Sequence, residues 1–175
     1  MRDIPYDERP YRPCVGIFLI NSTKQVFGGR RIDGRAEAWQ MPQGGIDPGE
    51  TVIDACMREM SEEIGTSSAE LLCEHDEWLY YNIPLPLADR LWRGQYKGQK
   101  QKWMALRFTG KDEDININTA EPEFCEWRWL EPRELVNLAV PFKRDVYDDV
   151  LKAFSNFIWP PLCHKQTIKW AAKIF

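Results

Sequence analysis

The feature that most constrains the fold of this 175-residue chain is a helix-forming segment that follows a turn-rich loop at residues 44–49. Thr51 is a suitable N-cap, with Asp54 three residues on in a variant of the capping box. Gly65 is a suitable C-terminal breaker. The apolar residues recur at helical spacing on one face and are expected to pack into the core: Ile53, Cys56, Met57, Met60 and Ile64.

A different face of the same helix carries Glu59, Glu62 and Glu63, at positions i, i+3 and i+4. Like charges at this spacing repel by roughly 0.2–0.5 kcal/mol per exposed pair. The helix dipole adds to this cost in the last turns, and Arg58 neutralises only part of the charge. Mg²⁺ or Mn²⁺ suits such carboxylate ligands, so the pattern predicts a divalent-metal site. The alternative is a solvated acidic surface, the commoner meaning of a bare Glu-x-x-Glu-Glu pattern.

Composition indicates an ordinary globular domain, with 43% hydrophobic and 29% charged residues. No apolar run reaches the roughly 18 residues of a membrane span, and the first residues lack the apolar stretch of a signal peptide. The five cysteines are odd in number and widely spaced, which argues against a disulfide framework or a zinc site and favours the cytoplasm. The net charge of −4 gives no general reason to expect nucleic-acid binding.

Hydrophobic patterning predicts one α/β or α+β domain. Strands are expected at residues 13–20, 25–31, 71–80, 101–109 and 124–130, and an amphipathic closing helix at 141–158. Residues 32–37 are expected to form a polar loop. We expect a single domain over residues 1–158 and a loosely attached tail over 159–175.

The segment from residue 44 has fixed residues at defined spacings: Gly44, five residues, Glu50, seven residues, Arg58-Glu59-Met60, one residue, Glu62-Glu63, one residue and Gly65. It resembles the signature box of the Nudix hydrolases at every fixed polar and glycine position. Thr66 is the one soft departure, because the family usually has an aliphatic residue there. The resemblance implies the Nudix fold, a mixed β-sheet between α-helices, and metal-dependent hydrolysis of a pyrophosphate bond.

The resemblance also implies roles for the box residues. The metal ligands are implied to be Glu59, Glu62 and Glu63. The backbone carbonyl of Gly44 or Gly45 is expected to join them. Arg58 resembles the arginine that orders the glutamates, with Glu50 as its ion-pair partner. Water is expected to attack phosphorus in line, with Glu63 or Glu59 as the base.

Further segments match one branch of the family: Tyr11-Arg12-Pro13 followed by Val15-Gly16, Trp39-Gln40-Met41-Pro42-Gln43-Gly44-Gly45, Gly98-Gln99-Lys100-Gln101-Lys102-Trp103, Glu123-Phe124, Trp127-Arg128-Trp129 and Phe142-Lys143-Arg144-Asp145-Val146-Tyr147. They cover most of residues 11–158. This branch contains the bacterial RNA pyrophosphohydrolases and the plant-type diadenosine tetraphosphate hydrolases.

The branch resemblance implies further site residues. Glu123 resembles an extra metal-binding or catalytic glutamate, although a glutamate after Pro122 is otherwise most simply a surface residue. Arg31 and Phe142 resemble a pair that clamps a base, with core packing as the alternative for Phe142. The other implied substrate-binding residues are Arg12, Gln40, Lys100, Lys102 and Lys143. Taken singly, these lysines are also compatible with simple solvation.

The expected reaction converts 5′-triphosphate RNA to 5′-monophosphate RNA. The close alternative is asymmetric hydrolysis of a dinucleoside polyphosphate, because residues 90–103 look closer to the dinucleotide hydrolases and residues 32–38 form a longer stretch than in the bacterial RNA enzymes. A third hypothesis, a non-catalytic module that only binds RNA or nucleotides, would be marked by loss of a box glutamate, and all are present. We expect no DNA and no membrane partner, and the oligomeric state stays open.

Overall fold

The structure, a computed structural model, describes residues 4–32 and 38–159. At its centre β1 (Tyr11–Ile20) and β7 (Gly98–Phe108) run parallel along their whole length. The other strands extend this sheet through antiparallel pairings: β2 (Val26–Arg31), β3 (Trp39–Gln40), β4 (Gln43–Gly45), β5 (Ala69–Glu74), β6 (Leu79–Asn82) and β8 (Phe124–Leu130). The sheet is therefore mixed.

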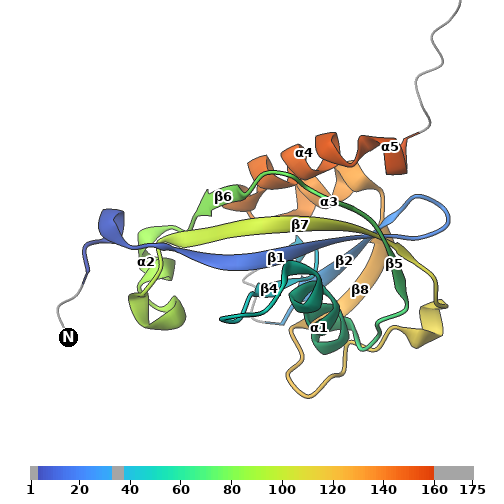
Figure 1. Ribbon diagram of the computed structural model, residues 1–175, viewed down its shortest axis with the longest axis horizontal. Coiled ribbons are helices and arrows are strands. Elements are labelled where there is room, and N and C mark those ends of the chain that lie inside the picture. The colour runs from blue at the N-terminus through green and yellow to red at the C-terminus, as the bar shows by residue number, and fades with distance from the viewer. Residues whose placement is uncertain (1–3, 33–37, 160–175) are drawn as a thin grey trace, which may run out of the picture.

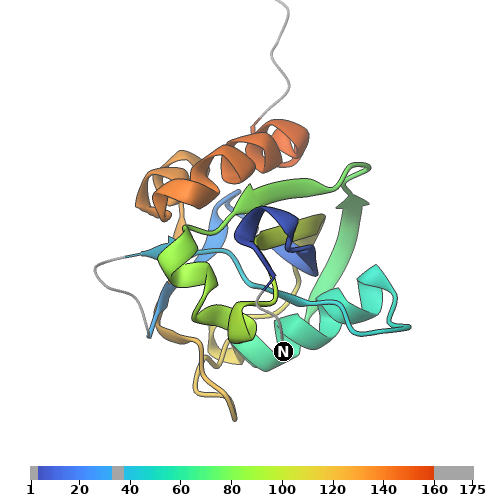
Figure 2. The ribbon, with the colours of Figure 1, turned by 90° about the vertical axis from the view of Figure 1, so that its left-hand side faces the viewer.

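Apolar residues on both faces of β1 explain why helices lie on both sides of the sheet. Every residue of β1 from Cys14 onward is buried. Phe18 packs in the hydrophobic cluster on the side of α4 (Arg144–Ala153), whereas Ile17 packs in the cluster beneath α1 (Val52–Ile64). Successive strand residues point to opposite faces, so a strand that is apolar throughout requires a covering layer on each side. Figures 1 and 2 show these layers, and the expected mixed sheet between helices is confirmed.

The acidic helix forms where the sequence predicts it. The hydroxyl oxygen of Thr51 accepts a hydrogen bond from the backbone N–H of Asp54 at 3.2 Å, and α1 ends at Gly65 in the left-handed conformation. One member of the predicted apolar stripe is wrong, because Ile53 is exposed. The buried face of α1 centres on Cys56 and its neighbours four residues apart, and Ile53 lies to one side of that line.

The strand predicted at residues 71–80 is also wrong in its continuity. It is two strands, β5 and β6, separated by residues 75–78. Both pair with β7, but β5 pairs with its second half and β6 with its first residues, in a different register. The intervening residues are left out of the ladder. Register between distant strands is not encoded in the local pattern, so the break could not be seen in the sequence.

The closing helix predicted at 141–158 is divided into three pieces: η4 (Pro141–Lys143), α4 and α5 (Ser155–Ile158). The backbone at Phe154 leaves helical geometry, with φ −101° and ψ 16°, which ends α4. Short elements that the sequence analysis did not predict complete the fold: η1 (Tyr6–Glu8), α2 (Leu85–Ala88), η2 (Leu91–Gly94), η3 (Asp112–Asp114) and α3 (Pro132–Leu138).

Two expectations concern residues that the structure describes only in part. The predicted loop at 32–37 lies outside the described residues except for residue 32, and the predicted tail is described only at residue 159. The domain boundary at residue 158 therefore stays a prediction. None of the helices in residues 4–32 and 38–159 has the length and apolar character needed to cross a membrane.

Candidate active site

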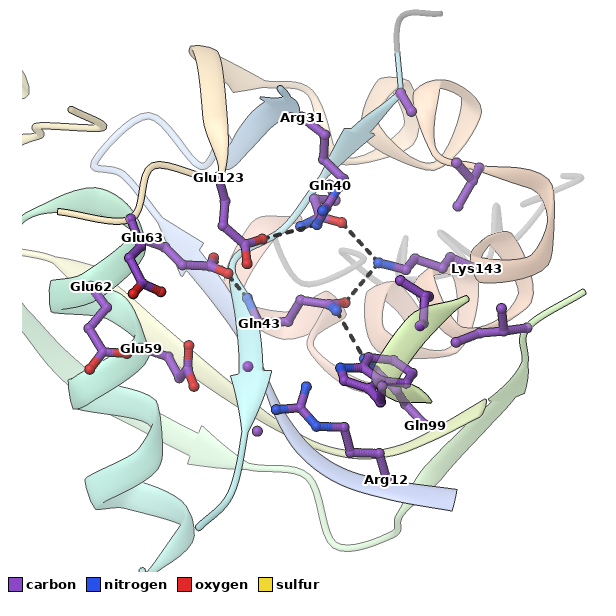
Figure 3. Close-up of a pocket in the computed structure, with 18 of the residues that line it drawn as sticks. Arg12, Arg31, Gln40, Gln43, Glu59, Glu62, Glu63, Gln99, Glu123 and Lys143 are labelled. Atoms are coloured by element: carbon purple, nitrogen blue, oxygen red, sulfur yellow. Dashed lines mark hydrogen bonds and ion pairs between the residues drawn. The ribbon is translucent and has the colours of Figure 1, made fainter. Parts of the chain in front are cut away.

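One large cleft, of about 1150 Å³, collects most of the residues that the sequence singled out. Figure 3 shows its two sides. The side that we call the acidic wall consists of Glu59, Glu62 and Glu63 of α1 and Glu123, which immediately precedes β8. The side that we call the amide wall consists of Gln40, Gln43, Gln99 and Lys143. The cleft thus places carboxylates opposite a buried amine and several amides.

Glu63 is the most deeply buried carboxyl group of the acidic wall, only 4% exposed. Its Oε2 accepts a hydrogen bond from the backbone N–H of Gln43 at 3.1 Å, whereas its Oε1 is buried with no hydrogen-bond partner. Burial, and next the charge of Glu123, raise the pKa of Glu63 well above its ordinary value. A buried carboxylate with an unsatisfied oxygen is costly, so this group requires either a proton or a cation.

Glu59 lies against the backbone of Gly44. A Cβ atom at position 44 would collide with the Glu59 carboxyl group, so only glycine allows this approach. Burial raises the pKa of Glu59, although Arg58 opposes the shift. The packing brings a carboxylate and a main-chain segment together at one end of the cleft, where both can offer oxygen atoms to a cation.

Arg58 ties the box residues together. Its Nε and Nη2 donate to the two carboxylate oxygens of Glu50, each at 2.8 Å, and its Nη1 donates to Glu59 at 2.7 Å and to Glu62 at 3.0 Å. Its Nη2 also donates to the carbonyl of Gly45 at 2.8 Å. Hydrogen bonds from Arg58 lower the pKa of Glu50 to about 2. This network supplies a physical basis for the ordering role that the resemblance implies.

The acidic wall fits a divalent cation, although its carboxylates are not gathered around one. Within residues 4–32 and 38–159, no three acidic, histidine or cysteine side chains are grouped closely enough to hold a metal. Arg58 holds Glu59 and Glu62, which accounts for the separation. The unpartnered oxygen of Glu63 and the concentration of carboxylates match the oxygen ligands that Mg²⁺ and Mn²⁺ prefer. Arg58 donates to the carbonyl of Gly45, and Gly44 pairs with Val15 in the β1–β4 ladder, so the choice between the two main-chain carbonyls stays open.

Lys143 is the centre of the amide wall. Its Nζ donates to Gln40 Oε1 at 2.9 Å and to Gln43 Oε1 at 3.0 Å, and only 7% of the residue is exposed. Burial, and next the charge of Arg31, lower the pKa of Lys143 to about 8. Neutral amide oxygens rather than a carboxylate are its hydrogen-bond acceptors. A buried ammonium group in this setting favours an anion that enters the cleft.

Comparison with known proteins identifies the family. The model of the NUDIX domain matches residues 10–150. The chain belongs to the NUDIX domain family. It is 52% identical over 149 residues to an RNA pyrophosphohydrolase of Rickettsia bellii (strain OSU 85-389), covering 85% of this chain and 92% of that protein. It is 50% identical over 153 residues to an RNA pyrophosphohydrolase of Wolbachia pipientis subsp. Culex pipiens (strain wPip), covering 87% and 94%.

Solved structures with little sequence similarity have the same fold. The E. coli dihydroneopterin triphosphate pyrophosphohydrolase superposes with a TM-score of 0.62 at 20% identity, covering 81% of this chain and 97% of that one. A C. elegans Ap4A hydrolase, solved as a binary complex, gives a TM-score of 0.60 at 18% identity, covering 83% and 98%. At these identities the likeness shows the NUDIX fold alone.

The structure brings most of the predicted substrate-binding residues of this NUDIX domain to the cleft. Arg12 lines it, with its guanidinium 5.1 Å from the centre of the Trp92 ring. Arg31 lines it with Nη1 3.0 Å from Glu123 Oε2. Phe142 also lines it, while its ring lies 5.8 Å from that of Tyr81. Phe142 therefore packs against a core ring and faces the cleft, so both predicted roles for it stay open.

Lys100 and Lys102 are not among the residues that line the cleft, and the phosphate contact predicted for them stays a prediction. Lys100 lies over the Trp78 ring at 4.9 Å, and Lys102 donates to the carbonyls of His75 and Asp76. Side chains alternate along β7, so Gln99 points to the face opposite Lys100 and Lys102, and it is Gln99 that lines the cleft.

Sequence analysis missed the buried glutamine network behind Lys143. Gln43 Oε1 accepts from both Lys143 and Gln101, and Gln43 Nε2 donates to Gln99 Oε1 at 3.3 Å. Gln101 is fully buried and also donates to Gln99 at 2.9 Å. The available signal was the Gln-Lys-Gln-Lys alternation at 99–102, which separates two faces of a strand without saying which one meets the cleft.

Proposed function

We propose that this NUDIX hydrolase removes pyrophosphate from 5′-triphosphorylated RNA and leaves a 5′ monophosphate. The observation that carries the proposal is the division of charge across one cleft, with a carboxylate cluster opposite the buried amine of Lys143. The name RNA pyrophosphohydrolase borne by relatives at 50–52% identity supports RNA as the substrate.

The residues of the cleft divide the work between its walls. Lys143 and Arg31 attract the polyphosphate, and Arg12 stands at the side of the cleft next to Trp92. The acidic wall, with the carbonyl of Gly44 or Gly45, would hold a divalent cation, Mg²⁺ or Mn²⁺. Such a cation lowers the pKa of water and neutralises charge on phosphate oxygens. Glu63 or Glu59 accepts the proton of the attacking water.

Direct attack by water fits the side chains that are available. Among the described residues that line the cleft there is no histidine or cysteine, so neither Ser61 nor Thr119 has a histidine base there to activate it. Water adds its oxygen to a phosphorus atom, the phosphoanhydride bond breaks, and pyrophosphate departs. The monophosphate stays on the RNA, and no covalent enzyme intermediate forms.

The test compares the full-length protein on triphosphorylated RNA and on diadenosine tetraphosphate, measuring kcat/KM for both with Mg²⁺ and with Mn²⁺. We expect a larger kcat/KM for the RNA, pyrophosphate as the released product, and one solvent ¹⁸O atom in the products. Absence of solvent oxygen in every product would contradict direct hydrolysis. Release of orthophosphate alone would contradict the proposed bond.

Hydrolysis of a dinucleoside polyphosphate is the second candidate. The observation that favours it is that Arg90, Leu91 and Trp92 line the cleft, since they belong to the segment whose sequence looks closer to the dinucleotide hydrolases. A ring and a guanidinium at this position could receive a second nucleoside. A higher kcat/KM for diadenosine tetraphosphate, with ATP and AMP as products, would favour this candidate, and formation of two ADP molecules would exclude the asymmetric cut.

A further inference from the structure

A chain of aromatic and basic side chains leads away from the cleft. It begins where the guanidinium of Arg12 lies over the Trp92 ring, whose other neighbour is the ring of Tyr96 at 5.9 Å. The next residue, Lys97, places its Nζ 5.1 Å from the centre of the Tyr11 ring. Because Arg12 and Trp92 line the cleft, this chain is continuous with the candidate active site.

The chain continues onto the face of β6 and β7 that is turned away from the cleft. The Tyr11 ring lies 5.1 Å from that of Tyr80, which stands opposite Lys100 in the strand ladder. Lys100 in turn lies over the Trp78 ring. We call the whole set the aromatic–lysine track: Tyr11, Trp78, Tyr80, Tyr96, Lys97 and Lys100.

Packing does not account for the rings of this track. Tyr11, Trp78, Tyr80 and Tyr96 belong to neither hydrophobic cluster of the described residues, and Tyr80 is 52% exposed. Figure 1 shows the first residues of β1 and β7 extending beyond α1, so that helix does not cover this part of the sheet. The other three rings are half-buried, and aromatic residues gathered with cations at a surface outside the core indicate a binding site.

We infer that the aromatic–lysine track binds the single-stranded part of an RNA whose 5′ end occupies the cleft. Rings with adjacent lysines suit single-stranded RNA, because bases of any sequence can stack on the rings while the lysines attract phosphates. Lys102 does not take part, since its charge is paired with Glu74, whereas Lys97 donates only to the backbone carbonyl of Asp7 among the described contacts. The inference rests on the proposed function, because it takes RNA as the substrate.

The experiment compares two substrates, a triphosphorylated dinucleotide and an unstructured triphosphorylated RNA of about 20 nucleotides, longer than the roughly 4–16 nucleotides that one single-strand-binding fold holds. Trp78→Ala and Tyr80→Ala should each raise KM for the long RNA about 5-fold, the low end of the stacking effect, and the double variant should raise it further. Neither should change kcat or the KM for the dinucleotide, because both rings lie outside the cleft.

Trp159→Ala is the matched control. Trp159 is also exposed and also lies against a cation, Arg133, but stands beyond α5 and outside the track. It should leave the KM for both substrates unchanged. Because Tyr80 is exposed on a strand surface, Tyr80→Ala should keep the thermal stability of the parent protein and remain informative if Trp78→Ala folds poorly.

Direct binding of a 5′-hydroxyl RNA of the same length separates this inference from the proposed function. If the wild-type protein hydrolyses neither triphosphorylated substrate but the double variant loses affinity for the hydroxyl RNA, the track stands and the proposed reaction fails. If hydrolysis proceeds, and the double variant matches the wild type in both KM for the long RNA and affinity for the hydroxyl RNA, the inference is overturned. The rings of the track are then left for a protein partner.

Discussion

The two walls of the cleft are built in opposite ways. Three of the four residues of the acidic wall come from less than two turns of α1, whereas the amide wall takes its residues from β3, β4, β7 and η4. The first gathers negative charge that Arg58 offsets only in part, and the second surrounds one buried ammonium group with neutral amides. Arg58 and Arg31 pair with the other carboxylates of the acidic wall, but neither Glu63 nor Lys143 has an ion pair among the described contacts, and a cation bound to a polyphosphate supplies a partner for both.

Removing a carboxylate charge from the acidic wall should have the largest effect on catalysis. Glu63→Gln and Glu62→Gln are expected to lower kcat about 1000-fold or more, about 4 kcal/mol, because cation binding is lost. Without metal, Glu63→Gln should hold or raise the melting temperature, since it removes a buried, unsatisfied carboxyl group. Steady-state kinetics at saturating Mg²⁺ and thermal unfolding in a chelator measure both effects.

The matched control for these variants is Glu70→Gln, which changes an exposed glutamate on β5 that pairs with Arg107 away from the cleft. It should leave kcat unchanged. Near-normal turnover of both Glu62→Gln and Glu63→Gln at saturating metal would mean that the acidic wall does not hold the cation, and the proposed mechanism would fail with it.

The three glutamates that α1 contributes to the acidic wall could be predicted from the sequence because their signals are local, whereas Glu123 is implied only by the resemblance. Thr51 and Gly65 bound the helix, and the spacing of the three glutamates places them together whatever the rest of the chain does. The amide wall depends on which strands pair and in which register, and no local pattern contains that information. For the same reason the sequence does not say which face of β7 meets the cleft, where Gln99 lies and Lys100 and Lys102 do not.

Neutral residues were also harder to recognise than charged ones. Gln43 and Gln101 have no charge or spacing that distinguishes them from surface glutamines, yet Gln101 is fully buried and Gln43 contacts residues from three other elements. Similarly, the ends of the strands within 71–80 depend on the separate pairings of β5 and β6 with β7. The roles of these glutamines and the ends of these strands depend on burial and strand pairing, which exist only in the folded protein.

Removing the ammonium group of Lys143 from the amide wall should have the second-largest effect on catalysis. Lys143→Met is expected to lower kcat/KM by about 10- to 100-fold, the range for a charged hydrogen bond to phosphate. The pKa of Lys143 is lowered to about 8, so in the wild type its charge is present below that pH and is lost as pH rises through it. The kcat/KM of the wild type should therefore fall above about pH 8, and Lys143→Met should remove that part of the profile.

Lys152→Met provides the comparison for this pH profile, because Lys152 is exposed on α4 and pairs only with Asp149 of its own helix among the described contacts. Its profile should match that of the wild type. An alkaline fall that persists unchanged in Lys143→Met would assign the titration to another group and would leave Lys143 as a packing residue.

The smallest effect should come from a residue that never reaches the cleft. Gln101 donates one of the two hydrogen bonds that orient the Gln43 carbonyl, while Lys143 donates the other. Gln101→Leu should free the Gln43 amide to turn and lower kcat/KM about 5-fold, the value of one hydrogen bond, mainly through KM. Its stability should change little, because the substitution also removes a buried oxygen that has no partner. Gln101→Glu would place a buried charge beside Gln99. It should lower both kcat/KM and the thermal stability more than Gln101→Leu does. If Gln101→Leu leaves KM and kcat at wild-type values while the protein stays folded, then Lys143 and Gln99 suffice to orient Gln43, and the amide wall does not depend on Gln101.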